Sequence, residues 1–271
     1  VNTGHGPGAL ISGQTIVVKT RGNSVGEALM DSVAMVAMTL GSSVEENFKS
    51  PGTEAKQVSM LRQEFIKARE YARKWKTAKA DSPPDRDLRL EMMEQVLDGR
   101  VPALITAQRA IDILAALRLQ QEFGFKLILD GAAESYLVVD QIKAAGIPVI
   151  LHPTMVRTDG DTRNASLETA HTLVAAGIPV ALQSGFEGYV PKTRVVLFEA
   201  AMAAANGLTF EQALRTITID AARIIGVADR VGSLEKGKDG DVAVFDGDPF
   251  EWTSHVCHVV IQGEEVSNTC N

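Results

Sequence analysis

Three features are scarce or absent in this sequence: long apolar runs, an excess of positive charge, and cysteine. No stretch approaches the roughly 18 apolar residues of a membrane span, and the most apolar one, residues 33–40, is far too short. We therefore expect no membrane span. The 34 acidic residues outnumber the 27 basic ones and give a net charge of −7. This balance argues against nucleic acid or an anionic membrane surface as the main partner.

The two cysteines, Cys257 and Cys270, lie close to the C-terminal end. Two interpretations are open. A disulfide across a terminal hairpin would imply an oxidising compartment; two ordinary thiols fit equally well, because spacing does not fix the geometry of a disulfide. The first residue is Val1 rather than Met, and no basic-then-apolar leader follows it. We expect a processed or incomplete chain, with a slight preference for an exported or periplasmic protein.

The N-terminal third of the sequence is predicted to hold one strand and three helices. Residues 14–20, QTIVVKT, are typical of a strand, and residues 24–40 are interpreted as a helix with a broad apolar face. Residues 54–78 repeat apolar side chains at helical spacing, with Lys and Arg in the last turns, where they suit the helix dipole. The prolines within residues 81–87 end this helix, and a shorter helix reaches Leu97.

Farther along the chain, short apolar runs alternate with helical segments that end in glycine. These runs are predicted to be strands: residues 101–107, 125–130, 147–152 and 178–182. The alternation is typical of βαβ units in a parallel sheet, and the continuous apolar character of each run indicates burial on both faces. Two short helices are expected within residues 208–226, followed by antiparallel strands with a turn at QGEE.

The most specific pattern is the tail, ALRTITIDAARIIGVADRVGSLEKGKDGDVAVFDGDPF followed by VVIQGEEV. It closely resembles the C-terminal segment of the amidohydrolase superfamily, and most of residues 90–267 resembles the imidazolonepropionase-like branch. The resemblance implies an α/β fold of the (β/α)8 TIM-barrel type, represented by its later βα units. Residues 1–239 would form the barrel portion and residues 240–271 strands of a small β-sandwich.

The same resemblance implies that part of the barrel comes from elsewhere. Family members carry about half a barrel upstream, with a His-x-His metal motif on the first strand, and nothing in this sequence matches those pieces. We expect an N-terminal half or a partner chain to complete the barrel. A homo-oligomer is a further expectation.

The family hydrolyses C–N bonds with a metal-activated water, so the resemblance also implies where ligands should stand. Thr106 and Gln108 occupy positions where the family often has His-Ala-His. Asp130 stands where a second His is expected, and Ser184 with Gly185 where a catalytic Asp is expected. Thr and Gln are poor replacements for imidazole on zinc. We predict no complete metal site and no cofactor in this chain, with zinc only if the missing half supplies ligands.

The candidate catalytic residues are His152, Asp130 and Glu187, each expected after a strand. His152 could instead be a hydrogen-bonded strand-end histidine, and Glu187 a solvated loop residue. The neighbouring polar positions are candidates for binding substrate: Thr106, Gln108, Arg109, Gln183 and Ser184.

Other polar residues have simpler interpretations. His255 and His258 would lie on opposite faces of a strand, so a shared metal is not expected. Lys19 ends the first strand, at a place where some amidohydrolases have a carboxylated, metal-bridging lysine, but the other ligands are missing. The sequence also allows an ion-pair network of Arg109, Asp112 and Glu134.

Three functions stay open at this stage. The first is a C–N (amide or lactam) hydrolase assembled with a missing N-terminal half. The second is a metal-free binding or structural subunit with an amidohydrolase fold. The third is metal-independent catalysis by His152 with Asp130 or Glu187.

Overall fold

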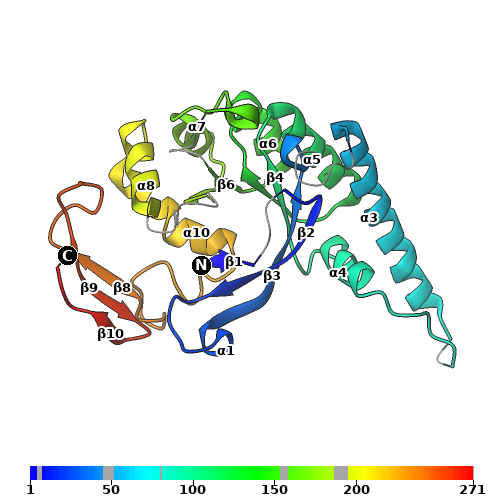
Figure 1. Ribbon diagram of the computed structural model, residues 1–271, viewed down its shortest axis with the longest axis horizontal. Helices are drawn as coiled ribbons and strands as arrows, with labels where there is room; N and C mark the ends of the chain where they lie inside the picture. Colours follow the sequence, from blue (N-terminus) through cyan, green and yellow to red (C-terminus); the bar gives the residue numbers. More distant parts are fainter. Residues whose placement is uncertain (5–7, 45–51, 80, 153–157, 186–194, 271) are drawn as a thin grey trace.

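The computed structural model describes residues 1–4, 8–44, 52–79, 81–152, 158–185 and 195–270. Two sheets organise the described chain (Figure 1). The large sheet has seven strands, in the spatial order of the sequence: β1 (Asn2–Thr3), β2 (Ile11–Val18), β3 (Leu29–Thr39), β4 (Ala103–Ala107), β5 (Leu127–Gly131), β6 (Val149–Leu151) and β7 (Val180–Leu182). The small sheet has the order β10 (Glu264–Ser267), β9 (Val256–Ile261), β8 (Val242–Phe245).

Helices follow the strands of the large sheet. They are α1 (Val25–Ala28), α3 (Glu54–Thr77), α4 (Leu88–Leu97), α5 (Ala110–Phe123), α6 (Val139–Ala145), α7 (Thr169–Ala175), α8 (Val196–Ala205), α9 (Phe210–Thr216) and α10 (Ile219–Ile224), with short 3₁₀ turns η1 (Ser135–Leu137) and η2 (Gly160–Thr162). Among the described residues, no helix combines the length and the apolar character needed to cross a membrane.

Strands β3 to β7 are parallel to one another, whereas β1, β2 and β3 pair antiparallel. The sheet curls, as in part of a barrel, with most helices on its convex side and α10 inside the curl (Figure 1). The four parallel strands predicted from apolar runs are therefore confirmed, as are the helix within residues 54–78 and the two short helices within residues 208–226.

The helix predicted over residues 24–40 is wrong. Only α1 is helical there, and the rest of the segment forms β3, the longest strand of the sheet. Residues 34–39 are buried one after another because β3 lies between β2 and β4 with both faces covered. Such a continuous apolar run does not distinguish a buried strand from a helix.

The curled sheet separates two hydrophobic cores. On the convex face, buried strand residues such as Ile105 and Leu129 pack with the helices, including Phe65 of α3. The Phe65 ring lies 4.9 Å from both the Phe123 and the Phe125 rings, measured between centroids. On the concave face, the buried strand side chains include Leu104, Ile128, Ile150 and Ala181, which cluster with Ala222 of α10 and with Val227.

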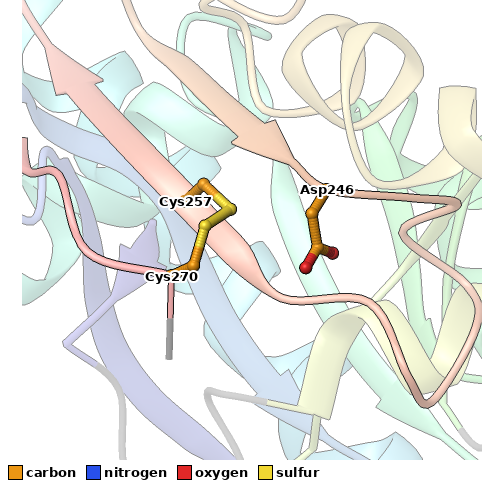
Figure 2. Close-up of side chains that lie close together, drawn as sticks. All are labelled: Asp246, Cys257 and Cys270. Atoms are coloured by element: carbon orange, nitrogen blue, oxygen red, sulfur yellow. A yellow bond between two sulfur atoms is a disulfide. The ribbon is translucent and has the colours of Figure 1, made fainter.

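The small sheet has the predicted hairpin. Gln262 and Gly263 connect β9 to β10, both with positive φ (57° and 79°), as a tight two-residue hairpin turn requires. Cys257 of β9 is joined by a disulfide to Cys270, which follows β10 (Figure 2). The disulfide interpretation of the two cysteines is thus confirmed.

Lys19 connects the two sheets. Its Nζ lies 2.8 Å from an oxygen of Asp239 and 2.8 Å from an oxygen of Asp241, and its side chain is only 5% exposed. Because β2 runs antiparallel to β3, Lys19 lies at the opposite end of the sheet from the carboxyl ends of the parallel strands. A metal-bridging role for Lys19 at those ends is therefore excluded. We name Lys19, Asp239 and Asp241 the Lys19 anchor.

Candidate functional site

Four polar side chains share the concave face at the carboxyl ends of the parallel strands. Side chains alternate between the two faces of a strand, so residues two positions apart share a face. Each of the four lies two positions after a buried residue of the concave core: Leu104, Ile128, Ile150 or Ala181. Backbone bonds from His152 N to Gly131 O (3.1 Å) and from Gln183 N to Leu151 O (3.2 Å) extend the strand pairing to these positions. The four residues are Thr106, Asp130, His152 and Gln183.

Asp130 is the centre of a hydrogen-bonded group. The Thr106 hydroxyl donates to one carboxylate oxygen of Asp130 at 2.6 Å, and the Gln183 amide donates to the other at 2.6 Å. Thr106 and Asp130 are direct partners in the β4–β5 register, and Asp130 is 9% exposed. Two neutral donors from two other strands thus hold this carboxylate. We name Thr106, Asp130 and Gln183 the Asp130 cluster.

His152 lies against the residue that follows Ser184. A Cβ built on Gly185 would come 2.3 Å from His152 Nε2, so only a glycine leaves room for the ring in this position. Gly185 also has a φ of +67°, which side-chain-bearing residues rarely adopt. The half-buried Ser184 lies between Gln183 and Gly185, so the segment after β7 reaches the Asp130 cluster through Gln183 and passes next to His152 at Gly185.

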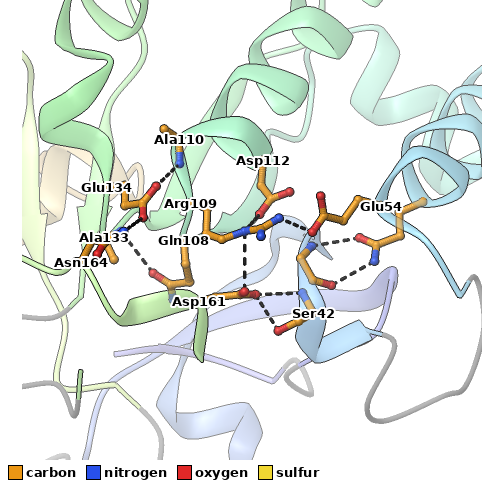
Figure 3. Close-up of polar contacts among 12 residues, drawn as sticks. Ser42, Glu54, Gln108, Arg109, Ala110, Asp112, Ala133, Glu134, Asp161 and Asn164 are labelled. Atoms are coloured by element: carbon orange, nitrogen blue, oxygen red, sulfur yellow. Dashed lines mark hydrogen bonds and ion pairs between the residues drawn. The ribbon is translucent and has the colours of Figure 1, made fainter. Parts of the chain in front are cut away.

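Gln108 is held in a different arrangement (Figure 3). Its side-chain oxygen accepts from Ala133 N at 3.2 Å, and its backbone oxygen accepts from Glu134 N at 2.8 Å. Glu134 in turn accepts from Ala110 N at 2.8 Å, the first backbone N–H of α5, and from the Asn164 side chain at 2.7 Å. Gln108 and Glu134 therefore fasten the loop after β4 to the loop after β5.

Arg109 lies in an acidic group at the rim. Its guanidinium contacts Asp112 at 3.2 Å and Asp161 at 3.6 Å, and it pairs with Glu54 at the start of α3 (Figure 3). Burial raises the pKa of the Asp112 carboxyl, against the opposing influence of Arg109. The network predicted from sequence thus contains Arg109 and Asp112, while Glu134 belongs to the Gln108 contacts instead. Sequence reasoning missed Glu54 and Asp161, which come from other elements.

The remaining predicted residues lie elsewhere. Glu187 is outside the described residues. His255 Nδ1 contacts Asp246 at 3.1 Å and His258 Nδ1 contacts Glu265 at 2.8 Å, so the two histidines face different carboxylates.

Among the described strand-end residues, no three potential ligand side chains lie close enough together to hold one metal ion. Catalytic zinc sites need three His, Cys, Asp or Glu ligands, and within the described ranges only one group of three meets that condition: Asp246, Cys257 and Cys270 of the small-sheet region. At the strand ends, the carboxylate of Asp130 accepts from Thr106 and Gln183 where imidazole ligands would be needed.

Glu134→Ala tests the loop contacts. The substitution leaves the half-buried first N–H of α5, that of Ala110, without its acceptor, which we expect to cost about 1–2 kcal/mol of unfolding free energy. Glu168→Ala is the matched control, because Glu168 precedes α7 without a side-chain capping bond. Urea denaturation measures both, and equal losses would show that Glu134 contributes nothing as a cap.

Comparison with known proteins gives consistent matches. A sequence model of the amidohydrolase family matches residues 106–267. An amidohydrolase structure from Thermotoga maritima superposes with a TM-score of 0.91 at 32% identity, covering 97% of this chain and 70% of that one. An adenosine deaminase structure from Xanthomonas campestris, at 15% identity and a TM-score of 0.53, agrees in fold alone.

Curated relatives match over a shorter stretch. Imidazolonepropionase from Porphyromonas gingivalis is 32% identical over 120 residues, which is 42% of this chain and 28% of that protein. The same enzyme from Rhizorhabdus wittichii is 30% identical over 139 residues, or 49% and 35% of the two chains. The matched part therefore spans about a third of the length of these relatives.

Proposed function

The chain belongs to the amidohydrolase family, and from that membership we propose that its strand-end site binds a small amide or lactam compound without a metal ion of its own. The similarity to imidazolonepropionases favours ligands in which a nitrogen is bonded to a carbonyl carbon, as in an amide or a lactam. The observation that carries the proposal is the Asp130 cluster, two of whose members, Thr106 and Asp130, occupy positions where the family resemblance implies metal ligands.

Asp130 positions Gln183. A carboxylate only accepts hydrogen bonds, so the Gln183 group 2.6 Å from it is the NH₂, and the amide oxygen points elsewhere. The amide of Gln183 is thereby fixed in one orientation, with a carbonyl oxygen and a second N–H to present. These are the complements of the N–H and C=O of an amide or lactam. Thr106, on the far side of the carboxylate, keeps Asp130 in place.

His152 adds polar atoms next to this amide. His152 stands between Asp130 and Gln183 in strand order, at the end of β6. Its imidazole offers a donor or an acceptor, depending on the tautomer. In this proposal Gln183 contacts the ligand, and Thr106 and Asp130 are positioning residues.

Gln183→Met tests the proposal with hydantoin, a small ring with two carbonyl groups flanking an N–H, as the probe. Methionine keeps the approximate volume of glutamine and removes its hydrogen bonds, so we expect the affinity for hydantoin to fall at least about tenfold. Gln141→Met, at an exposed position of α6, is the control and should bind like the parent chain. Isothermal titration calorimetry gives the affinities. Equal hydantoin affinities in the two variants would show that Gln183 does not contact the ligand.

Hydrolysis of a C–N bond is the second candidate function. The Thermotoga maritima match favours it. This chain aligns with 70% of that amidohydrolase, so about 30% of the amidohydrolase has no counterpart in this sequence. A further segment or partner chain would then supply the missing ligands. Chromatography of hydantoin after incubation with the complete native protein tests this, because hydrolysis gives a ring-opened acid and binding alone leaves the ring intact.

A further inference from the structure

The small sheet carries a second polar group that is separate from the strand-end site. Asp246 follows β8, Cys257 lies within β9, and Cys270 follows β10. One potential ligand atom from each lies within 4.8 Å of the other two. Figure 2 shows the Asp246 carboxylate beside the Cys257–Cys270 disulfide. Three consecutive elements of the sheet thus bring a carboxylate and two sulfurs together.

We propose that Cys257, Cys270 and Asp246 bind a thiophilic divalent cation of the zinc type when the disulfide is reduced. Two thiolates and one carboxylate form a trianionic, mainly sulfur ligand set, which selects zinc over magnesium or calcium. This proposal is independent of the function proposed above.

The chemical change is a two-electron reduction. A dithiol reductant gives two electrons and two protons to the S–S bond, which breaks into two thiols while the dithiol closes to its own disulfide. The cation then displaces both thiol protons to solvent, because only thiolates ligate. The metal site and the disulfide therefore exclude each other.

Two ligands are held and the third has room to move. Cys257 is fixed in the central strand of the small sheet and is 8% exposed. The Asp246 carboxylate accepts from His255 N at 2.7 Å and contacts His255 Nδ1 at 3.1 Å, which orients it. Cys270 is exposed and lies beyond the last paired residue of β10. Its sulfur can move to about 3.5–4 Å from that of Cys257, the separation set by Zn–S bonds of about 2.3 Å in a tetrahedral site.

Solvent supplies the remaining coordination position. Asp246 and Cys270 are both exposed, so water has access to the site from their side. A site with three protein ligands and an open fourth position is a known arrangement for zinc.

Cobalt(II) is the probe, since tetrahedral thiolate–cobalt sites absorb in the near ultraviolet and the visible. The full chain is reduced with dithiothreitol, desalted without oxygen and titrated with cobalt. We expect charge-transfer and d–d bands that saturate near one equivalent in the reduced chain and are absent in the oxidised chain. This comparison needs no substitution, so it does not depend on whether a variant folds.

Variants identify the ligands. Cys270→Ser should lose most of the charge-transfer intensity, and Asp246→Asn should keep the bands but lower the cobalt affinity at least about tenfold. His258→Gln is the control, because His258 lies on β9 and contacts Glu265 instead; it should titrate like the parent chain. The proposal is overturned if the reduced chain shows no cobalt bands, if Cys270→Ser retains them in full, or if Asp246→Asn binds cobalt as tightly as the parent chain.

Discussion

Replacing Lys19 by methionine is expected to lower the free energy of unfolding by about 3 kcal/mol, because it removes the buried cation between two partly buried carboxylates. Asp241 then loses its ion-pair partner, and Asp239 keeps only Arg230, 2.8 Å away. The Lys19 side chain is 5% exposed, and its ammonium lies 2.8 Å from both Asp239 and Asp241. Methionine retains most of the apolar part of the lysine side chain, so the loss of unfolding free energy measures the contribution of the ammonium group. Urea denaturation monitored by circular dichroism measures it.

Lys67→Met is the matched control. Lys67 pairs with Glu64 one helical turn away, and its side chain is 43% exposed. Glu64 also pairs with Arg89 at 2.8 Å and so keeps a cation in the variant, and we expect the loss to be about 0.5 kcal/mol or less. If the two variants lose the same stability, the Lys19 anchor does not connect the sheets in an energetically important way.

The effect of Lys19→Met should also depend on pH. The hydrogen bond from Lys19, supported by one from Arg230, lowers the pKa of the Asp239 carboxyl below its ordinary value. Stabilisation by a carboxyl with a lowered pKa is complete above the pKa of the unfolded state and is lost as pH falls through the pKa of the folded state. The stability difference between parent and variant should therefore be largest near neutral pH and shrink in acid.

Gly185→Ala is expected to cost about 2–3 kcal/mol of unfolding free energy, from a left-handed backbone and a steric clash together. The φ of Gly185 is +67°, and the new Cβ would come 2.3 Å from His152 Nε2. Because the ring must turn away from the strand end, the hydantoin affinity should fall as well. Urea denaturation and calorimetry measure the two effects.

Gly177→Ala separates backbone strain from the clash. Gly177 has a φ of +81° with no atom within 4 Å of a built Cβ, so alanine there should cost only about 1 kcal/mol. Its hydantoin affinity should equal that of the parent chain. A loss as large as that of Gly185→Ala would mean that contact with His152 plays no part.

Local pattern was sufficient for the parallel strands. Residues 125–130 and 147–152 are short, continuously apolar and flanked by glycine-ended helices, which matches β5 and β6 closely. The same rule failed at residues 24–40, because burial of β3 on both faces comes from β2 and β4 and the helices around them, not from the segment itself.

The site was predictable only in part. Strand ends and alternation bring Thr106, Asp130 and Gln183 to one face, and all three were candidates from sequence. The bond from Gln183 to Asp130 was not predictable, since it joins β7 to β5 across an intervening strand. The Lys19 contact with Asp241 spans 222 residues. Gln108 was predicted to bind substrate, a role that stays a prediction, and its contact with Ala133 depends on a loop conformation that spacing does not encode.

The central claim is that the strand-end site binds an amide compound without a metal ion held by this chain. Calorimetric titration of hydantoin into the oxidised protein, before and after treatment with EDTA, tests it most directly, because the intact disulfide keeps the small-sheet cysteines from binding metal. We predict the same affinity in both titrations, together with the loss in Gln183→Met. Binding that disappears on chelation and returns with added zinc would contradict the claim.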